Sequence, residues 1–310
     1  MSRNFALILL ILGLIAAFSC SLLDLRPETS GNRYALIAGL EYSGNLKLTY
    51  TVSDAEDMEA ALTSLGYQAS RITVEGGDVT KKVILDAVSD LQAQVTGDDL
   101  VLFFFAGHSD IKDGTFFIEA EGNTRITREE LLHAFALFSC PVVIIMDSCF
   151  SGGCIPEDPY SVDILYYRDS DKDFRDTLPG NAYSQAVEAF FRTPEESSGM
   201  HAHIWVFTAA GYHQKSFEPL PGSAGLDLYG NTVENGYFTH FLLMGLAQEG
   251  EFLRADANFD GVLTLSELYG FVLREFHVHR DQLVLLPLRR YLPHVSGSPR
   301  DVLLGYSHPL

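Results

Sequence analysis

Short apolar segments alternate with amphipathic segments along most of the chain. Apolar runs predict strands over 33–40, 67–73, 99–107, 141–146 and 203–210, with a small β-excursion over 114–120. Apolar residues at helical spacing predict helices over 53–66, 79–95, 127–138, 237–248 and 265–276. Mostly apolar strands that alternate with helices are typical of a parallel sheet covered on both faces. The sequence therefore predicts one α/β domain over 33–310, with helices sandwiching a mostly parallel sheet.

Two of the predicted helices carry a signal at their N-termini. In a capping box, a Ser or Thr at the N-cap is followed three residues later by Glu, and each side chain accepts the other residue's backbone N–H. Ser53 with Glu56, and Thr127 with Glu130, have this spacing. We therefore expect a helix to begin at each of these positions.

The first 20 residues have the layout of an export signal. Arg3 gives a positive start, an uninterrupted apolar run covers 5–18, and small residues precede Cys20. The run is shorter than the roughly 20 residues that span a bilayer. It resembles a bacterial lipoprotein signal, which implies an exported protein held by an N-terminal lipid at Cys20 on the periplasmic or cell-surface side. Cleavage without acylation and an uncleaved anchor are the alternatives; 21–32 is predicted to be a tether.

Composition restricts the partners that the protein can bind. The formal net charge is −20, from 41 acidic and 21 basic residues. This excess argues against a nucleic-acid partner, because phosphates are bound by clustered Lys and Arg. It suits cationic ligands, whether metal ions or basic peptides. Beyond Cys20 the cysteines are Cys140, Cys149 and Cys154, an odd number without paired Cys/His spacing, so neither a disulfide framework nor a zinc site is predicted.

A cysteine and a histidine stand where two predicted strands end. His108 follows the strand 99–107, and Cys149 follows the strand 141–146. Ligands of parallel α/β sheets bind beyond the carboxyl ends of the strands. If the two strands are neighbours, both side chains open into one crevice, where the imidazole can activate the thiol. The alternative is an inert cysteine and an ordinary hydrogen-bonded histidine.

The residues around Cys149 support the catalytic interpretation. Gly152 and Gly153 would leave the backbone free to approach a substrate, and N–H groups near Cys149 could donate to an oxyanion. Cys140, in contrast, precedes a strand and so lies at the wrong end for chemistry, and Cys154 has no evident partner.

These residues carry a resemblance to caspase-like cysteine peptidases, most closely to metacaspases and their bacterial relatives. The stretches "FFFAGHSD" and "IIMDSCFSGG" resemble the histidine and cysteine blocks of that family. Further blocks that resemble it, in the family's order, are "YALIAGLEY", "TVSDAEDM", "FTAAGYHQKSFE", "NGYFTHFLLMGL" and "YLPHVSGSPRDVLL". The resemblance runs from about Arg33 to Leu304 and implies a caspase-like fold that hydrolyses peptide bonds.

The resemblance also implies a role for each residue of the site. His108 would be the acid and base, Cys149 the nucleophile, and the backbone N–H groups of Cys149 and Ser109 would hold the oxyanion. The family usually has Gly where this chain has Ser109, and a Cβ restricts the backbone angles there. In metacaspases, acids matching Asp54 and Asp147 bind an Arg or Lys before the scissile bond, and two carboxylates suit such a cation. For Asp54, a favourable position near a helix N-terminus is the alternative explanation.

The stretch "DANFDGVLTLSE", 256–267, matches a twelve-residue EF-hand loop position by position. Gly261 would make the sharp turn, and the helix predicted over 265–276 follows as the motif requires. An acidic capped turn without metal is the alternative. The Ca²⁺ ligands that the match implies are Asp256, Asn258, Asp260, the carbonyl of Val262, Thr264 and Glu267.

Taken together, the sequence predicts a cysteine endopeptidase that acts on peptides or proteins with basic residues, cleaves after Arg or Lys, and needs no cofactor for the chemistry. The same dyad with Asn or Asp specificity is one alternative. A catalytically inactive, calcium-responsive binding module with the same fold is another. An acidic insertion over 155–202 is expected beside the active site. The resemblance implies that the chain can be cut in this segment, which makes its basic residues candidate self-cleavage sites; a loop that is never cut is the alternative.

Overall fold

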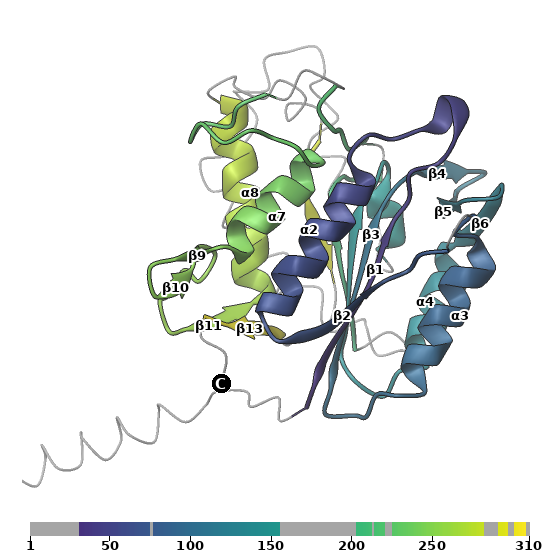
Figure 1. Cartoon of the computed structure of the whole chain (residues 1–310), viewed down its shortest axis with the longest axis horizontal. Helices are drawn as coiled ribbons and strands as arrows, with labels where there is room; N and C mark the ends of the chain where they lie inside the picture. Colours follow the sequence, from purple (N-terminus) through teal and green to yellow (C-terminus); the bar gives the residue numbers. More distant parts are fainter. Residues whose placement is uncertain are drawn as a thin grey trace, which may run out of the picture. The chain divides into compact units, whose positions relative to one another are not determined.

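Six strands form the central sheet, in the order β12-β8-β7-β3-β1-β2 (Figure 1). They are β1 (Arg33–Gly39), β2 (Tyr67–Arg71), β3 (Leu100–Ala106), β7 (Val142–Asp147), β8 (Ile204–Thr208) and β12 (His294–Ser296). Every neighbouring pair is parallel except β12 and β8. The predicted mostly parallel α/β sheet is therefore confirmed.

This computed structural model describes residues 31–74, 77–155, 203–212, 214–220, 225–281, 291–296 and 301–307. They belong to one unit, Gly31–Leu310. The predicted export signal with Cys20, almost all of the tether and all but the first residue of the acidic insertion lie outside the described residues, so they stay predictions. Within the described ranges, no helix combines the length and the hydropathy needed to span a bilayer.

Helices cover both faces of the sheet (Figure 1). The helices α3 (Lys81–Gln92) and α4 (Arg128–Ala136) cover one face, and α2 (Thr51–Ser64), α7 (Tyr237–Leu246) and α8 (Leu265–Asp281) cover the other. In β3, Phe104 packs into the core beneath α2, α7 and α8, whereas Phe103 and Phe105 pack into the core beneath α3 and α4. Successive side chains of a strand point to opposite faces, so a strand covered on both sides is apolar throughout.

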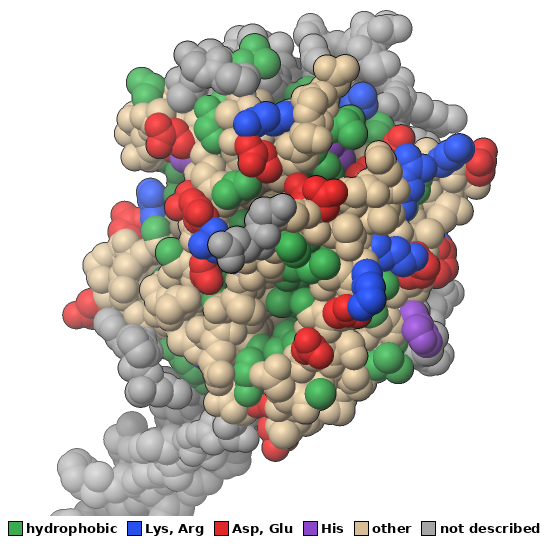
Figure 2. Space-filling model, turned by 45° about the vertical axis from the view of Figure 1, so that its right-hand side comes forward, with side chains coloured by type: hydrophobic (Ala, Val, Ile, Leu, Met, Phe, Trp, Pro, Cys, Tyr) green, Lys and Arg blue, Asp and Glu red, His purple; other side chains and the backbone are tan. Residues whose placement is uncertain are grey.

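Smaller elements extend this core. The predicted β-excursion is the middle strand of a three-stranded antiparallel sheet. This sheet contains β4 (Ser109–Lys112), β5 (Thr115–Ala120) and β6 (Thr124–Thr127). The remaining short elements are η1 (Gly44–Leu46), η2 (Ser151–Cys154), β9 (Gln248–Glu249), β10 (Phe252–Leu253), β11 (Val262–Thr264) and β13 (Leu303–Tyr306). On the face shown in Figure 2, acidic side chains are spread across the surface and interspersed with basic ones.

One of the two predicted capping boxes is present. Thr127 caps α4, and its side chain and that of Glu130 accept each other's backbone N–H groups, as predicted. The box predicted for Ser53 and Glu56 is wrong. The helix α2 already begins at Thr51, so Ser53 lies in its first turn and caps nothing.

Candidate active site

The register of the sheet brings the predicted histidine and cysteine to one end. β3 and β7 are neighbouring parallel strands, and Ala106 lies opposite Asp147, the last residue of each strand. The pairing continues one step further, because Gly107 N–H donates to the Asp147 carbonyl at 3.2 Å. His108 and Cys149 each follow two residues after their strands. The two strands are therefore neighbours, which is the condition for a shared crevice.

A pocket of about 90 Å³ lies at this end of the sheet. It gathers four side chains that the sequence singled out, His108, Cys149, Asp54 and Asp147, from segments up to 95 residues apart along the chain. The polar residues that line this pocket include Asp54, His108, Asp147, Cys149, Ser216 and Glu218.

The thiol of Cys149 is protonated in its resting environment. Its Sγ donates to the Ser216 carbonyl at 3.7 Å. Burial raises the pKa of Cys149, and the Ser216 contact and the charge of Lys215 offset this increase only in part. A thiol with a raised pKa needs a base close by to become a nucleophile.

The other two described cysteines lack such surroundings. Burial raises the pKa of Cys140 to about 11 and that of Cys154 to about 12. Both thiols are free and buried, as is typical of unreactive structural cysteines.

The imidazole of His108 is oriented by a backbone carbonyl. Its Nε2 lies 2.8 Å from the Leu46 carbonyl oxygen, which can only accept. Nε2 therefore carries the proton in the neutral ring, and Nδ1 is left with the lone pair of a base. In this arrangement Cys149 Sγ contacts the Ser216 carbonyl rather than the imidazole. Catalytic hydrogen bonds commonly tighten only when substrate is bound.

Tyr42 holds the backbone of His108 in an unusual way. His108 lies opposite Glu119 at the start of the β4–β5 ladder, and Glu119 N–H donates to the His108 carbonyl at 2.9 Å. The bond expected in the other direction, from His108 N–H to the Glu119 carbonyl, is replaced by two bonds through the Tyr42 hydroxyl. His108 N–H donates to Tyr42 Oη at 2.8 Å, and Tyr42 Oη donates to the Glu119 carbonyl at 2.7 Å. The Tyr42 ring also packs against the imidazole, with 4.7 Å between the ring centroids.

Ser109 fits the site although the related family usually has Gly there. Its φ is not positive, so the Cβ meets no backbone restriction. Its buried hydroxyl contacts the Ser148 hydroxyl at 2.8 Å and donates to the Cys149 carbonyl, which joins the His108 and Cys149 turns. Because His108 and Glu119 form the hydrogen-bonded pair, the next residue's N–H points away from β5. Ser109 N–H is therefore free of that ladder.

Gly152 and Gly153 have a different role from the one predicted. A Cβ on Gly152 would lie 2.6 Å from the Tyr212 backbone nitrogen, and one on Gly153 would lie 2.9 Å from the Phe116 side chain. The two glycines are buried. They permit close packing inside the protein, so the prediction that they open the backbone to a substrate is wrong.

The two predicted substrate-binding acids converge on Gly236. Asp54 Oδ1 accepts Gly236 N–H at 3.0 Å. Asp147 accepts the Ser216 hydroxyl at 2.7 Å and the Thr239 hydroxyl at 2.7 Å. A Cβ on Gly236 would lie 2.5 Å from Asp147 Oδ2 and 3.3 Å from Asp54 Oδ2. Asp54 therefore does more than occupy a helix N-terminus, because it meets the second acid across the pocket.

A third carboxylate, which the sequence analysis missed, completes this acidic wall. Glu218 lines the same pocket and is positioned by the backbone N–H groups of Thr49 and Tyr50, at 2.9 and 3.1 Å. The sequence did contain a signal for Glu218, because this residue ends the stretch "FTAAGYHQKSFE", which carries part of the family resemblance. Three carboxylates from three segments make the pocket suitable for a cation.

The two aspartates repel one another in the absence of such a cation. Burial, and then the nearby Asp147 carboxylate, raise the pKa of Asp54 well above its usual value. Burial also raises the pKa of Asp147, and the Glu218 charge adds to this shift. An acid whose pKa is raised in the folded state destabilises the fold increasingly as pH rises above its unfolded value.

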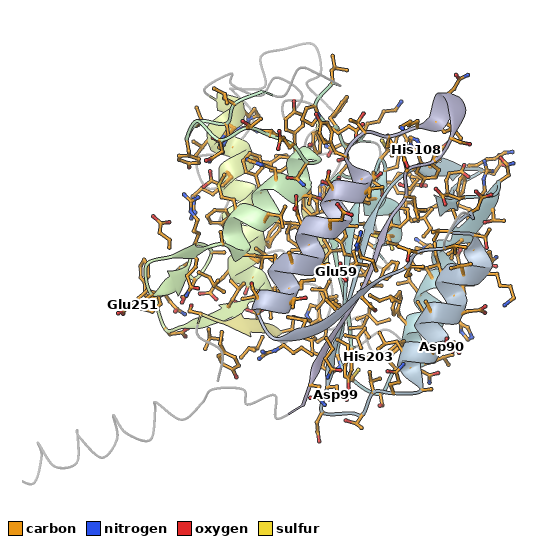
Figure 3. The ribbon with its side chains drawn as sticks, viewed as in Figure 1. Glu59, Asp90, Asp99, His108, His203 and Glu251 are labelled. Carbon is orange, nitrogen blue, oxygen red and sulfur yellow. The ribbon has the colours of Figure 1, made fainter. Side chains whose placement is uncertain are left out.

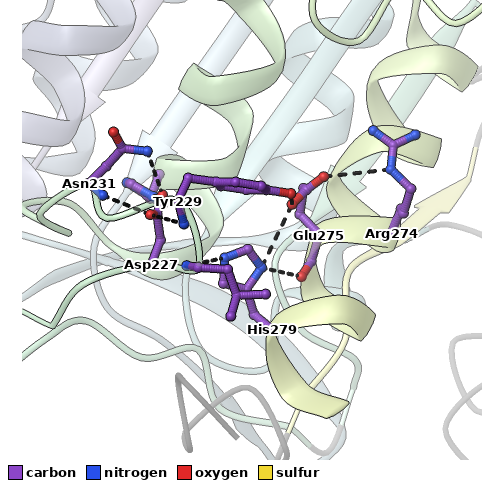
Figure 4. Close-up of polar contacts among 8 residues, drawn as sticks. Asp227, Tyr229, Asn231, Arg274, Glu275 and His279 are labelled. Atoms are coloured by element: carbon purple, nitrogen blue, oxygen red, sulfur yellow. Dashed lines mark hydrogen bonds and ion pairs between the residues drawn. The ribbon is translucent and has the colours of Figure 1, made fainter. Parts of the chain in front are cut away.

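Asp54→Asn should therefore raise the melting temperature at neutral and alkaline pH. The gain should be about 3 °C for each kcal/mol of repulsion removed. It should shrink toward pH 4, near the pKa of an unfolded Asp, where the wild-type side chain keeps its proton. Asp90→Asn, an exposed substitution on α3 (Figure 3), is the matched control. Thermal unfolding from pH 4 to 8 measures this; a loss of stability in Asp54→Asn at pH 8 would contradict it.

The predicted calcium ligands lie in the loop 256–267 and not in this pocket. In the part of the chain that the structure describes, no three His, Cys, Asp or Glu side chains form a ready-made metal site.

Comparison with known proteins agrees with this arrangement. The Caspase domain family, Peptidase_C14, matches residues 32–277. The structure is similar to caspase-1 from Spodoptera frugiperda, with 13% identity, a TM-score of 0.54, and coverage of 90% of this chain and 94% of that one. It is also similar to protein GSU0716 from Geobacter sulfurreducens, with 16% identity, a TM-score of 0.50, and coverage of 87% and 95%. No curated protein matches the chain significantly.

The two structural similarities bear on the fold alone, because their sequence identities are low. The family match is decisive, since it covers most of the chain and includes both strand ends that form the pocket. The chain belongs to the caspase domain family of cysteine-type peptidases.

Proposed function

We propose that the protein is a cysteine endopeptidase that cleaves after Arg or Lys, with Cys149 as the nucleophile and His108 as the general acid and base. The observation that carries this proposal is the shared pocket. It combines a thiol and an imidazole at adjacent strand ends with a wall of three carboxylates. A binding module needs the acidic wall but has no use for the thiol and imidazole beside it.

The chemistry would begin with a proton transfer. Nδ1 of His108 takes the thiol proton of Cys149 once the substrate has displaced Sγ from the Ser216 carbonyl, and Sγ then attacks the scissile carbonyl carbon. The carbonyl oxygen becomes negatively charged. The N–H groups of Ser109 and Cys149 would be the backbone donors that stabilise it.

The second half of the reaction returns the enzyme to its starting state. His108 gives its proton to the leaving amine as the C–N bond breaks, which leaves the acyl group on Cys149 as a thioester. Water loses a proton to His108, attacks the thioester and releases the carboxylic acid. The proton then returns from the imidazole to the thiolate of Cys149. No cofactor is needed for these steps.

Specificity for a basic side chain follows from the charge of the pocket. Asp54, Asp147 and Glu218 line the pocket. Burial, and then the charge of neighbouring carboxylates, raise the pKa values of Asp54 and Asp147. A guanidinium or ammonium group would supply a counter-charge and release the mutual repulsion. An Asp or Asn side chain would add to the repulsion or leave it in place, so the alternative specificities are disfavoured.

An activity-directed thiol probe carrying Arg next to its reactive group tests the proposal. It should label Cys149 and should leave Cys140 and Cys154 unmodified, since both are buried with strongly raised pKa values. Labelling should fall sharply in His108→Ala. An inactive binding module would bind the peptide portion but label no faster than a free thiol, and that result would reject catalysis.

Tyr42→Phe should lower the turnover number by roughly tenfold while leaving KM near its wild-type value. Removing the hydroxyl leaves His108 N–H and the Glu119 carbonyl without their bridge, a loss of about 1–3 kcal/mol that acts on the imidazole and not on the acidic wall. Steady-state kinetics on an Arg peptide measures both constants. A change in KM alone would place Tyr42 in substrate binding instead of His108 positioning.

A further inference from the structure

A second acidic feature lies far from the pocket, in the loop 256–267 that joins β10 to α8. The strand β11 within it pairs with β13. In Figure 1, β11 and β13 lie at the lower end of the domain, whereas β4, next to His108, lies at the upper end. Figure 3 shows the same separation between His108 and Glu251, a residue of the β9–β10 turn just before this loop.

Three side chains of the loop accept hydrogen bonds from the loop's own backbone. Asp256 Oδ2 accepts Gly261 N–H at 2.9 Å. Asn258 Oδ1 accepts Asp260 N–H at 2.8 Å, and Asp260 Oδ1 accepts Val262 N–H at 2.8 Å. Gly261 adopts a positive φ of 82°, which permits the sharp turn. Asp256, Asn258 and Asp260, each two residues apart, thereby all accept N–H groups of the same loop.

One of these oxygens has no partner. Asp256 is only 1% exposed, and its Oδ1 makes no hydrogen bond to any described residue. The other oxygen of the same carboxylate accepts Gly261 N–H within the loop, so the unpartnered Oδ1 belongs to a carboxylate that the loop backbone holds in place. A buried carboxylate oxygen without a donor or cation is costly, because it has lost its water and gained nothing in exchange.

We propose that the loop binds one Ca²⁺ ion, with Asp256 as its central ligand. The donors are all oxygens, from Asp256, Asn258, Asp260, Glu267 and the Val262 carbonyl, and such a set suits a hard divalent cation. The ion would supply the partner that Asp256 Oδ1 lacks. This inference is independent of the proposed peptidase activity, because it rests on residues outside the pocket.

Glu267 has to move for the site to close. Its Oε2 accepts both the N–H and the hydroxyl of Thr264, at 3.0 and 2.9 Å. The carboxylate must leave these donors and turn to the ion. This rearrangement explains why the described side chains do not form a ready-made metal site, and it lowers the affinity by the free energy of the bonds given up.

The ion would stabilise the layer formed by α2, α7 and α8 on one face of the sheet. Glu267 lies in the first turn of α8, and Leu268 and Val272 of that helix are buried in the core beside α7. Ca²⁺ binding would therefore hold the first turn of α8 in place against the core. The distance from His108 in Figures 1 and 3 makes this an effect on stability and not on the chemical step.

The test is calorimetric titration of the metal-free full-length protein with Ca²⁺, together with thermal unfolding. We expect one binding site, and a rise in melting temperature of about 5 °C when free Ca²⁺ reaches about a hundred times the dissociation constant. Glu267→Gln should lose most of that rise, because it replaces a charged bidentate ligand with a neutral amide. Asp256→Asn should lose it as well while keeping an acceptor for Gly261 N–H.

The controls distinguish binding of Ca²⁺ at this loop from non-specific screening of the protein's charge. They are needed because a chain with a net charge of −20 is stabilised by any divalent ion. Glu251→Gln removes one exposed charge close to the loop and should keep the full Ca²⁺ response. Mg²⁺ at the same concentration should produce a smaller shift, because it requires tighter octahedral geometry. Absence of binding heat, an equal shift with Mg²⁺, or an unchanged response in Glu267→Gln would each overturn the proposal.

Discussion

Cys149→Ala is expected to abolish peptide hydrolysis, with turnover reduced by at least about 10⁴-fold, as is typical when a catalytic nucleophile is removed. His108→Ala should produce a loss of similar size, because the two groups act as one unit and neither works without the other. The physical reason is the raised pKa of the Cys149 thiol, which stays protonated unless the imidazole takes its proton.

Both variants should keep the wild-type fold, so that a loss of turnover can be assigned to the chemical step and not to unfolding. Cys149 is only partly buried, and His108 also lies at the edge of the pocket. Cys140→Ala, in the core, should keep most of its activity and is the matched control. Turnover with a fluorogenic Arg peptide and circular dichroism measure the two properties. Wild-type turnover in Cys149→Ala would refute the assigned nucleophile.

The second large effect is expected in substrate preference. Peptides with Arg before the cut should be hydrolysed faster than the same peptides with citrulline, which has the shape of Arg without its charge. Asp147→Asn and Asp54→Asn should each reduce this ratio by about 1–3 kcal/mol, or roughly 5- to 150-fold, if charge-assisted hydrogen bonds to the guanidinium carry it. The measured quantity is the ratio of kcat/KM for the two substrates.

The pH dependence of that ratio gives an independent check. Burial and mutual repulsion raise the pKa of Asp54 and of Asp147, so protonation removes their charge at a higher pH than for exposed acids. The preference for Arg over citrulline should therefore decline as pH falls. Asp90→Asn on α3 should leave the ratio unchanged. Equal rates for Arg and citrulline, or a preference for Asp, would reject a basic specificity.

The type of fold and the proposed catalytic pair could both be predicted from the sequence alone. The apolar run before His108 and the one before Cys149 each predict a strand buried on both faces. Such strands belong to parallel sheets, and the ends of parallel strands are where ligands bind. Local patterns of this kind depend on residues close together in the chain, which is why they could be recognised without the structure. The capping box of Thr127 and Glu130 is local in the same way.

Local patterns were misleading where a distant contact decided the outcome. Ser53 and Glu56 have the spacing of a capping box, yet α2 begins earlier, at Thr51, whose hydroxyl bonds to the Leu40 carbonyl at the end of the β1 segment. The sequence predicted that Gly152 leaves the backbone open to a substrate, but the backbone of Tyr212 fills the space that a Cβ would need there. In both cases the competing partner comes from another segment.

The way in which the site is assembled could not be read from the sequence. The order of the sheet places β3 beside β7, and no local pattern encodes which strands pair. The third carboxylate, Glu218, reaches the pocket because N–H groups of Thr49 and Tyr50, about 170 residues earlier in the chain, hold it there. The Tyr42 hydroxyl, from a segment earlier in the chain, bridges the His108 N–H and the Glu119 carbonyl. Contacts of this kind form only after packing has brought the segments together. The proposed catalytic residues could therefore be recognised in the sequence, whereas the fold determines what surrounds them.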